Sequence, residues 1–206
     1  SGGSSGSPVI DVEGRAVALN AGGAMQSASS FYLPLDRVAR ALSRIQAGQP
    51  VARGTLGVIF GYTPYDELRR LGLRPQTEAR WRSIFARNVG MLVVREVQPG
   101  CGADQRLAPG DVLLRVDGRD VPDFLTLDEV LDSAVGRSLD VVVERGGSEQ
   151  TLSLRVDDLH AMSPSEYTQF SDGVFHALSY QMARHINVPM GGVFVADPGY
   201  VFGNAG

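Results

Sequence analysis

The chain has 206 residues, of which 43% are hydrophobic and 20% charged, which is typical of a folded globular protein of one large or two small domains. Its net charge of −4 argues against nucleic acid as a main partner, and it lacks the run of about 18 apolar residues that a transmembrane helix needs. The single cysteine, Cys101, excludes an internal disulfide and a cysteine-built zinc site. We find no residue pattern that indicates a metal or another cofactor, so we expect none.

The first nine residues, Ser1 to Val9, allow two interpretations. Glycine and serine in this proportion are typical of a flexible linker. The same residues could also form the nucleophile loop of a serine protease, in which a serine lies in a tight Gly-rich turn and backbone N–H groups point at the developing oxyanion. The composition of the stretch alone leaves both open.

A small β-rich region follows. Short β-rich runs on either side of Glu13-Gly14 predict a hairpin. Small and polar residues predict a loop over 21–30, and an apolar run then predicts a strand at 31–33. Apolar residues at helical spacing predict a helix from Leu35 to Ile45, and Gly48 and Pro50 end it. The predicted elements are strands at 9–13, 15–20 and 31–33 and a helix at 35–45.

A second region begins near Gly54 and alternates strands with short helices. Asp117-Gly118 and residues 145–148 have the composition of hairpin turns. The predicted strands are 56–60, 90–97, 112–116, 139–144 and 151–156, and the predicted helices are 65–73, 76–85 and 126–134.

The C-terminal stretch begins the same order of elements again. Ser163 to Glu166 has the pattern of a capping box and predicts a short helix. A strand at 174–175, a helix at 178–186 and a strand at 192–196 follow. Residues 191–195 are similar to residues 89–93, and we interpret this as an internal repeat of a small α+β module whose second copy is truncated.

Several stretches resemble one protein family. Gly90 to Val93, Val97 to Gly100, Leu107 to Leu113 and Val116 to Gly118 resemble the core of a PDZ domain, and more narrowly the PDZ domains fused to HtrA/DegP-type serine proteases. Residues 3–9, 14–23 and 31–38 are similar to the nucleophile loop, the following hairpin and the closing helix of those proteases. Residues 65–73 and 178–184 resemble the large fungal and plant members with several PDZ-like modules.

The resemblance implies a mixed fold in three parts. Residues 1–48 would form the C-terminal part of a trypsin-like β-barrel protease domain, 49–158 an α+β PDZ domain, and 159–206 the truncated start of a second PDZ-like module. It also implies a trypsin-like triad whose histidine and aspartate lie upstream of Ser5, so His160, His176 and His185 are interpreted as ordinary surface or packed side chains.

The resemblance assigns roles to two groups of residues in the N-terminal region. Ser5 would be the nucleophile, with the backbone N–H groups of Gly3 and Ser5 as oxyanion donors and Ser4 shaping the loop. Many family members have asparagine at the position of Ser4 and glycine at that of Ser7. Substrate would pair with an edge strand and enter a primary pocket at Asn20, Ala21 and Gly22.

A peptide C-terminus would add a strand to the PDZ sheet, in the mode known as β-augmentation. The loop for its carboxylate and the first strand would comprise Thr55, Leu56, Gly57 and Val58. Leu127, Val130 and Leu131 could line a side-chain pocket or could be ordinary core residues.

The function implied is that of an HtrA-type serine endopeptidase that cleaves unfolded or damaged proteins through an acyl-enzyme, with PDZ binding of peptide C-termini for capture or regulation. The alternative is a non-catalytic PDZ adaptor with a degenerate protease-like remnant. The resemblance further suggests a homo-oligomer of the full-length protein and an intracellular location, in the nucleus or an organelle. We expect neither a cofactor nor nucleic acid nor a membrane span.

Overall fold

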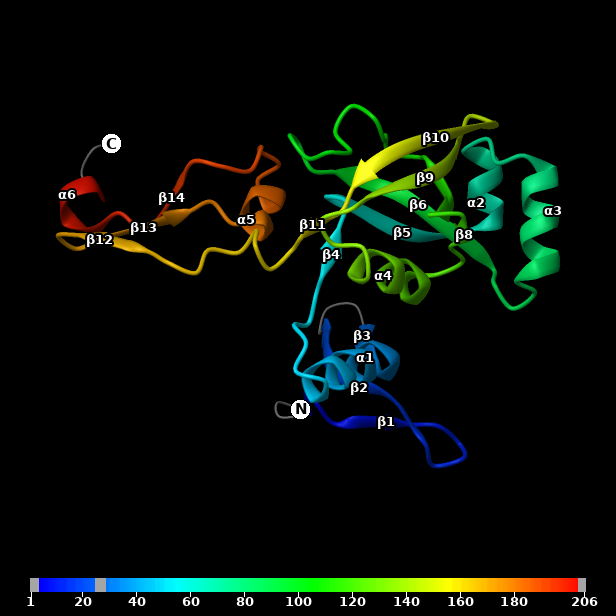
Figure 1. Cartoon of the computed structure of the whole chain (residues 1–206), viewed down its shortest axis with the longest axis horizontal. Helices are drawn as coiled ribbons and strands as arrows, with labels where there is room; N and C mark the ends of the chain where they lie inside the picture. The colour runs from blue at the N-terminus through cyan, green and yellow to red at the C-terminus, as the bar shows by residue number, and fades with distance from the viewer. Residues whose placement is uncertain (1–3, 25–28, 204–206) are drawn as a thin grey trace. The chain divides into compact units, whose positions relative to one another are not determined.

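The computed structural model describes residues 4–24 and 29–203, and these form two compact units, 1–51 and 52–206 (Figure 1). Strands and helices occur in both, which confirms the mixed fold, and the described strands form no closed barrel. Among the described helices none is long and apolar enough to cross a membrane. The division into parts at 1–48, 49–158 and 159–206 stays a prediction.

The first unit is a three-stranded antiparallel meander followed by one helix. The sheet order is β1-β2-β3, and Pro34, which ends β3, is also the N-cap residue of the helix. None of its described residues is fully buried, and Phe31 and Ile45 are more than half exposed. The sheet and helix therefore enclose no core of their own. The elements are β1 (Pro8–Ile10), β2 (Ala16–Ala24), β3 (Ser29–Pro34) and α1 (Leu35–Gln46).

The predicted loop over residues 21–30 is wrong at both of its ends. β2 continues to Ala24 and β3 already begins at Ser29, with Gly22 opposite Phe31 and Gly23 opposite Ser30. Small residues are poor strand formers by themselves, but ladder hydrogen bonds to the neighbouring strand hold them extended. Residues 25–28 lie outside the described part of the chain.

The second unit is organised around one antiparallel sheet with the order β10-β9-β7-β6-β5, to which β8 adds by pairing with β7. A separate two-stranded ladder joins β4 to β11. The elements are β4 (Gly54–Thr55), β5 (Val58–Pro64), α2 (Tyr65–Arg70), α3 (Pro75–Ile84), β6 (Gly90–Val97), β7 (Val112–Val116), β8 (Arg119–Asp120), α4 (Phe124–Asp132), β9 (Ser138–Arg145), β10 (Ser148–Arg155) and β11 (Asp157–Asp158).

Both faces of this sheet are covered. Alternate residues of β6 contribute to two different cores, because side chains of a strand point to opposite faces in turn. Leu92 and Val94 pack in the core that includes α4, whereas Met91 and Val93 pack with Trp81 and the other residues of α2 and α3. The insertion containing α2 and α3 therefore lies on the face opposite α4, and it does not cover the α4 face.

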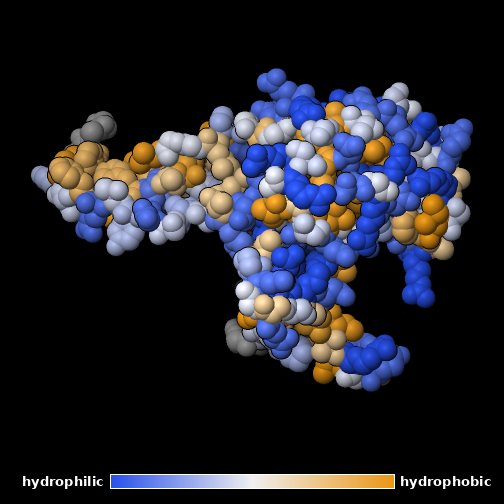
Figure 2. All heavy atoms as spheres, in the orientation of Figure 1, coloured by the Kyte–Doolittle hydropathy of each residue, from blue (hydrophilic) through white to orange (hydrophobic). Residues whose placement is uncertain are grey.

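The C-terminal stretch forms a small sheet of its own, in the order β12-β13-β14. Its large apolar side chains are mostly exposed, including Phe170 and Val193, and Figure 2 shows apolar residues over much of this part of the surface. The elements are β12 (Thr168–Phe170), β13 (Gly173–Ala177), α5 (Tyr180–His185), β14 (Val193–Asp197) and α6 (Gly199–Gly203).

The helix predicted from the capping box at Ser163 to Glu166 is wrong. No helix begins there, and the chain runs without regular structure into β12. A capping box only favours a helix whose apolar face then packs on something, and the residues from Ser163 to Phe170 are all exposed.

Candidate active site and peptide-binding edge

Ser5 lies in a tight turn formed by Ser4 to Ser7. The backbone N–H of Ser7 donates to the carbonyl oxygen of Ser4 at 3.1 Å, and Gly6 has a φ of +85°. A positive φ at the third residue of a β-turn alone is the mark of a type II turn, in which glycine is strongly favoured. Ser5 occupies the second position of this turn, and its side chain is exposed. The turn therefore presents the Ser5 hydroxyl to solvent.

The turn is attached to β2 through Asn20. The backbone N–H of Gly6 donates to the Asn20 carbonyl at 2.7 Å, and the Asn20 N–H donates to the Ser7 carbonyl at 2.9 Å. The Asn20 side-chain amide Nδ2 donates to both the carbonyl oxygen and the hydroxyl of Ser4, each at 3.1 Å. Residues 1–9 thus include a turn that is hydrogen-bonded to the sheet, which a flexible linker would not be.

The other predicted residues of this site are placed as follows. Gly3, the predicted oxyanion donor, lies outside the described residues. Ala21 is the extra residue of a bulge in β2, because Asn20 is opposite Tyr32 while Gly22 is already opposite Phe31. β2 is the middle strand where β1 pairs with it, but β1 reaches only as far as Leu19. Beyond that point no described strand pairs with the other edge of β2.

No histidine base is part of the described first unit. His160, His176 and His185 all belong to the second unit, and a ring nitrogen of His176 lies 2.8 Å from the Ala177 carbonyl oxygen. Among the described residues no cluster of histidine, cysteine or acidic side chains could hold a metal ion. The described part of the first unit therefore contains the exposed Ser5 but no histidine that could act as its base.

The predicted carboxylate loop of the second unit runs from Thr55 to Val58. Thr55 belongs to β4, Leu56 is buried, and Gly57 turns the chain with a φ of +70° into Val58, the first residue of β5. The Gly57 N–H donates to the Thr55 hydroxyl at 3.0 Å. One amide of the loop is therefore already satisfied within the loop.

β5 is an edge strand of the six-stranded sheet, since among the described strands it pairs only with β6. The Gln98 N–H donates to the Gly57 carbonyl at 2.8 Å, which makes the opposed residues Val58 and Val97 a non-hydrogen-bonded pair. The N–H and C=O of Val58 consequently point away from β6, toward the open edge. This is the arrangement that an added peptide strand requires.

The helix residues predicted as a possible pocket belong to the core. Leu127, Val130 and Leu131 are 9% exposed or less and pack in the same cluster as Leu56. The end of α4 is joined to the loop instead by Asp132, which accepts from the Gly54 N–H at 3.0 Å and from Arg53 Nη1 at 2.9 Å. Sequence reasoning missed this link, which fixes the start of the predicted carboxylate loop.

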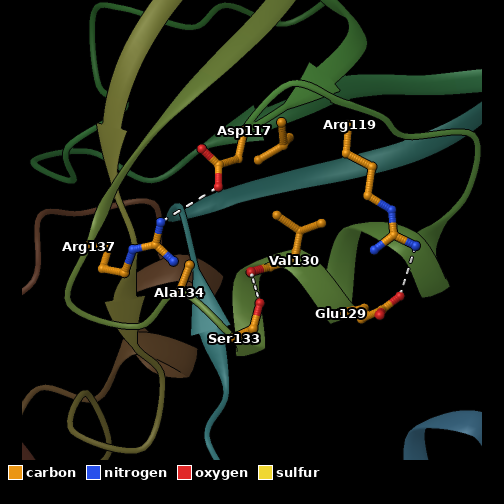
Figure 3. A pocket seen from close by; sticks show the side chains of 8 residues that line it. Asp117, Arg119, Glu129, Val130, Ser133, Ala134 and Arg137 are labelled. Atoms are coloured by element: carbon orange, nitrogen blue, oxygen red, sulfur yellow. Dashed lines mark hydrogen bonds and ion pairs between the residues drawn. The ribbon is translucent and has the colours of Figure 1, made fainter.

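A shallow pocket of about 190 Å³ lies beside α4, between this helix and the turn after β7 (Figure 3). It includes none of the residues 55–58. Its charged side chains are paired with one another, Arg119 with Glu129 at 3.0 Å and Arg137 with Asp117 at 3.6 Å. It is therefore separate from the predicted carboxylate loop.

Comparison with known proteins adds close relatives. A family model described as "PDZ-like domain" matches residues 161–206. "Protease Do-like 7" of Arabidopsis thaliana is 49% identical over 216 residues, covering 100% of this chain and 20% of the relative. "Pro-apoptotic serine protease NMA111" of Saccharomyces cerevisiae is 45% identical over 198 residues, covering 96% of this chain and 20% of the relative.

A solved structure described as "HtrA-type protease AlgW with decapeptide" matches 73% of this chain and 44% of its own, with a TM-score of 0.46 and 22% identity. The family is therefore inferred from the sequence relatives and not from this structural match. The chain spans about a fifth of the length of the curated relatives it matches. Over that span the resemblance to HtrA-type serine proteases with PDZ domains is confirmed.

Proposed function

We propose that this chain contributes the nucleophile to a serine endopeptidase of HtrA type that cleaves unfolded or damaged proteins. The observation that carries the proposal is the type II turn at Ser4 to Ser7, which is fixed to β2 and exposes Ser5. The names of the relatives support a protease and give no support to the non-catalytic adaptor.

In the proposed reaction the Ser5 hydroxyl oxygen attacks the scissile carbonyl carbon while a histidine takes up its proton. We expect that histidine, with its aspartate, from another part of the longer protein. The oxyanion would accept hydrogen bonds from the N–H groups of Ser5 and Gly3. The tetrahedral intermediate expels the amine, which receives the proton from the histidine. Water then hydrolyses the acyl-enzyme by the same steps and regenerates the Ser5 hydroxyl.

The open edge of β5 supports the second part of the proposal, in which a peptide C-terminus adds a strand beside β5. The outward N–H of Val58 would be the first donor to its carboxylate, and the neighbouring backbone groups would form the ladder. Peptide binding here would capture or regulate substrates of the protease.

A fluorophosphonate probe applied to the full-length protein tests the nucleophile, because such probes label only activated serines. Ser5→Ala should abolish labelling. Ser43→Ala is the matched control, since Ser43 is an exposed serine on α1 whose hydroxyl donates to the Ala39 carbonyl. Unchanged labelling of Ser5→Ala would remove Ser5 from the proposed role.

The peptide site is tested separately by fluorescence anisotropy with labelled peptides on the 206-residue chain. A peptide with a free C-terminal carboxylate should bind more tightly than the same peptide with an amidated C-terminus. Equal affinities for the two peptides would contradict the assignment of residues 55–58 to a carboxylate.

A further inference from the structure

We infer that Asn20 is a positioning residue that directs the Ser5 N–H toward the oxyanion, and that it is not a wall of the substrate pocket. This inference rests on the proposed function, because it assumes that Ser5 is the nucleophile.

Asn20 bonds to the turn on both sides of Ser5. Its side-chain Nδ2 contacts the Ser4 carbonyl oxygen and hydroxyl at 3.1 Å each, and its backbone carbonyl accepts from the Gly6 N–H at 2.7 Å. With the bond from its own N–H to the Ser7 carbonyl, Asn20 is hydrogen-bonded to Ser4, Gly6 and Ser7. None of these bonds engages the Ser5 hydroxyl.

The bond to the Ser4 carbonyl matters because of the planar trans peptide. The carbonyl of Ser4 and the N–H of Ser5 belong to one peptide group and point in opposite directions. The Ser4 carbonyl is held on the side of Asn20 and Ser7 by three donors, namely the Ser7 N–H at 3.1 Å, the Ser7 hydroxyl at 2.7 Å and Asn20 Nδ2. The Ser5 N–H must therefore point to the other side, away from the interior of the turn.

Only one of these donors comes from outside the turn. The two bonds from Ser7 would rotate together with the turn if it tilted against the sheet. Two backbone bonds also join the turn to β2, but they engage Gly6 and Ser7. Asn20 Nδ2 is the donor from β2 that reaches the Ser4 carbonyl, so its bond holds the Ser4–Ser5 peptide group in a fixed direction relative to the strand along which substrate would lie.

The bulge in β2 fixes the orientation of the Asn20 amide. Asn20 Oδ1 accepts from the Gly22 N–H at 3.3 Å, and Gly22 has a φ of +136°. With Oδ1 engaged in this way, Nδ2 is the atom that faces Ser4. A donor and an acceptor are thus both required at position 20, which asparagine supplies and an isosteric aspartate does not.

The test uses the full-length protein with fluorescein-labelled casein as an unfolded substrate, together with the fluorophosphonate probe. Asn20→Asp places an oxygen against the Ser4 carbonyl and hydroxyl, and we expect kcat and the rate of labelling to fall about 10- to 100-fold with KM unchanged. A loss of this size is a part of the roughly 100- to 1,000-fold effect of removing an oxyanion donor. Asn20→Gln retains the donor on a longer stem and should recover part of kcat.

A pocket wall would give the opposite pattern, with KM raised and the rate of labelling by a small probe unchanged. That result for Asn20→Asp overturns the inference. If circular dichroism shows that Asn20→Asp does not fold, the kinetics of Asn20→Gln provide the test. A change in KM alone in that variant overturns the inference, and a change in kcat alone supports it. If Ser5→Ala still reacts with the probe, the proposed function itself fails. Loss of labelling in Ser5→Ala with wild-type kcat in Asn20→Asp refutes only the role of Asn20.

Discussion

Glu144 is a fully buried carboxylate of the second unit, and its removal should lower the free energy of unfolding. Its side chain is fully buried in β9 beside the connection between α2 and α3. It accepts from the backbone N–H of Arg74 and from the Thr77 hydroxyl, each at 2.6 Å, and from Arg74 Nη2 at 3.2 Å. Glu144→Ala would leave the backbone N–H of Arg74 and the hydroxyl of the buried Thr77 without their acceptor, whereas Arg74 Nη2 would keep its bond to Glu149.

The magnitude follows from these three bonds. A hydrogen bond to a charged group contributes about 1.5–3 kcal/mol when buried, and breaking a buried ion pair costs about 3–5 kcal/mol. The Arg74 side chain is 39% exposed, so water can replace part of its bond. We therefore expect Glu144→Ala to lower the free energy of unfolding by about 3 kcal/mol, at the lower end of the range for a buried pair.

Glu149 provides a matched control on the adjacent strand. It pairs with Arg74 at 2.8 Å and with Arg115 at 3.0 Å, but its side chain is 41% exposed. Exposed ion pairs contribute about 0–1 kcal/mol, so Glu149→Ala should have a small effect although it also removes contacts to Arg74.

Urea unfolding followed by Trp81 fluorescence measures both variants. Trp81 is the only tryptophan of the chain, it is fully buried, and it lies in the core that α2 and α3 form on the sheet. Its emission therefore reports on the part of the molecule that Glu144 holds. If the two variants differ by less than about 0.5 kcal/mol, which is the usual size of surface effects, the argument from burial is refuted.

Three further outcomes can be measured on the same chain. The hydrogen bond from Arg69 holds the pKa of Glu78 at about 2, below its usual 4.5, so this stabilisation is complete above pH 4.5 and is lost as the pH falls through 2. Glu78→Gln should lower the free energy of unfolding in urea by up to about 1 kcal/mol at pH 7, because Arg69 is half exposed, and by less at pH 2. Gly54→Ala would drive a Cβ into the Leu131 carbonyl and should cost about 2–3 kcal/mol in thermal or urea unfolding, whereas Gly102→Ala, with open space around it, should be nearly neutral. Burial raises the pKa of the Cys101 thiol, so its alkylation by iodoacetamide, followed by mass spectrometry, should be slower than that of free cysteine at pH 7 and should accelerate at higher pH.

Strands that are bounded by clear turn signals could be predicted to the residue. The predicted strands 90–97 and 112–116 are β6 and β7 as the structure has them. Both are apolar runs that end at a turn, and Asp117 and Gly118 each have the positive φ that a tight hairpin needs. Local chemistry determines such elements, so the sequence is sufficient.

The contacts that hold the candidate site could not be predicted in this way. Asn20 and Ser4 are 16 residues apart and meet only because β2 passes the turn. The resemblance places Asn20 at the substrate pocket because it lies in the hairpin that corresponds to the pocket wall, and its side-chain partner leaves no signal in the local sequence pattern. The same holds for Asp132, whose partners Arg53 and Gly54 are 79 and 78 residues away.

The two modules of the second unit share one local arrangement of strands, but the loops before their first strands differ in charge. In each, a strand that begins at Gly-Val pairs antiparallel with a returning strand, and a Pro-Gly turn follows. The segment between the two strands is helical, with α2 and α3 in the first module and α5 in the second. The Pro-Gly turn contacts the loop before the first strand, through the Cys101 thiol at 3.7 Å from the Gly57 carbonyl in one module and through the Tyr200 N–H in the other.

The partner of Tyr200 is a carboxylate. Its N–H donates to Asp172 Oδ2 at 2.7 Å, and this bond lowers the pKa of the Asp172 carboxyl. The loop of the first module has no acidic residue from Thr55 to Val58, and the carboxylates beside it, Asp132 and Asp157, are ion-paired with Arg53 at 2.9 Å and with Arg155 at 3.7 Å, respectively. The corresponding loop of the second module contains the Asp172 carboxylate itself. A peptide carboxylate brought to the second loop would meet that like charge, which is unfavourable at short range. Under the proposed function, the edge of β5 is therefore the better suited of the two to receive a peptide C-terminus.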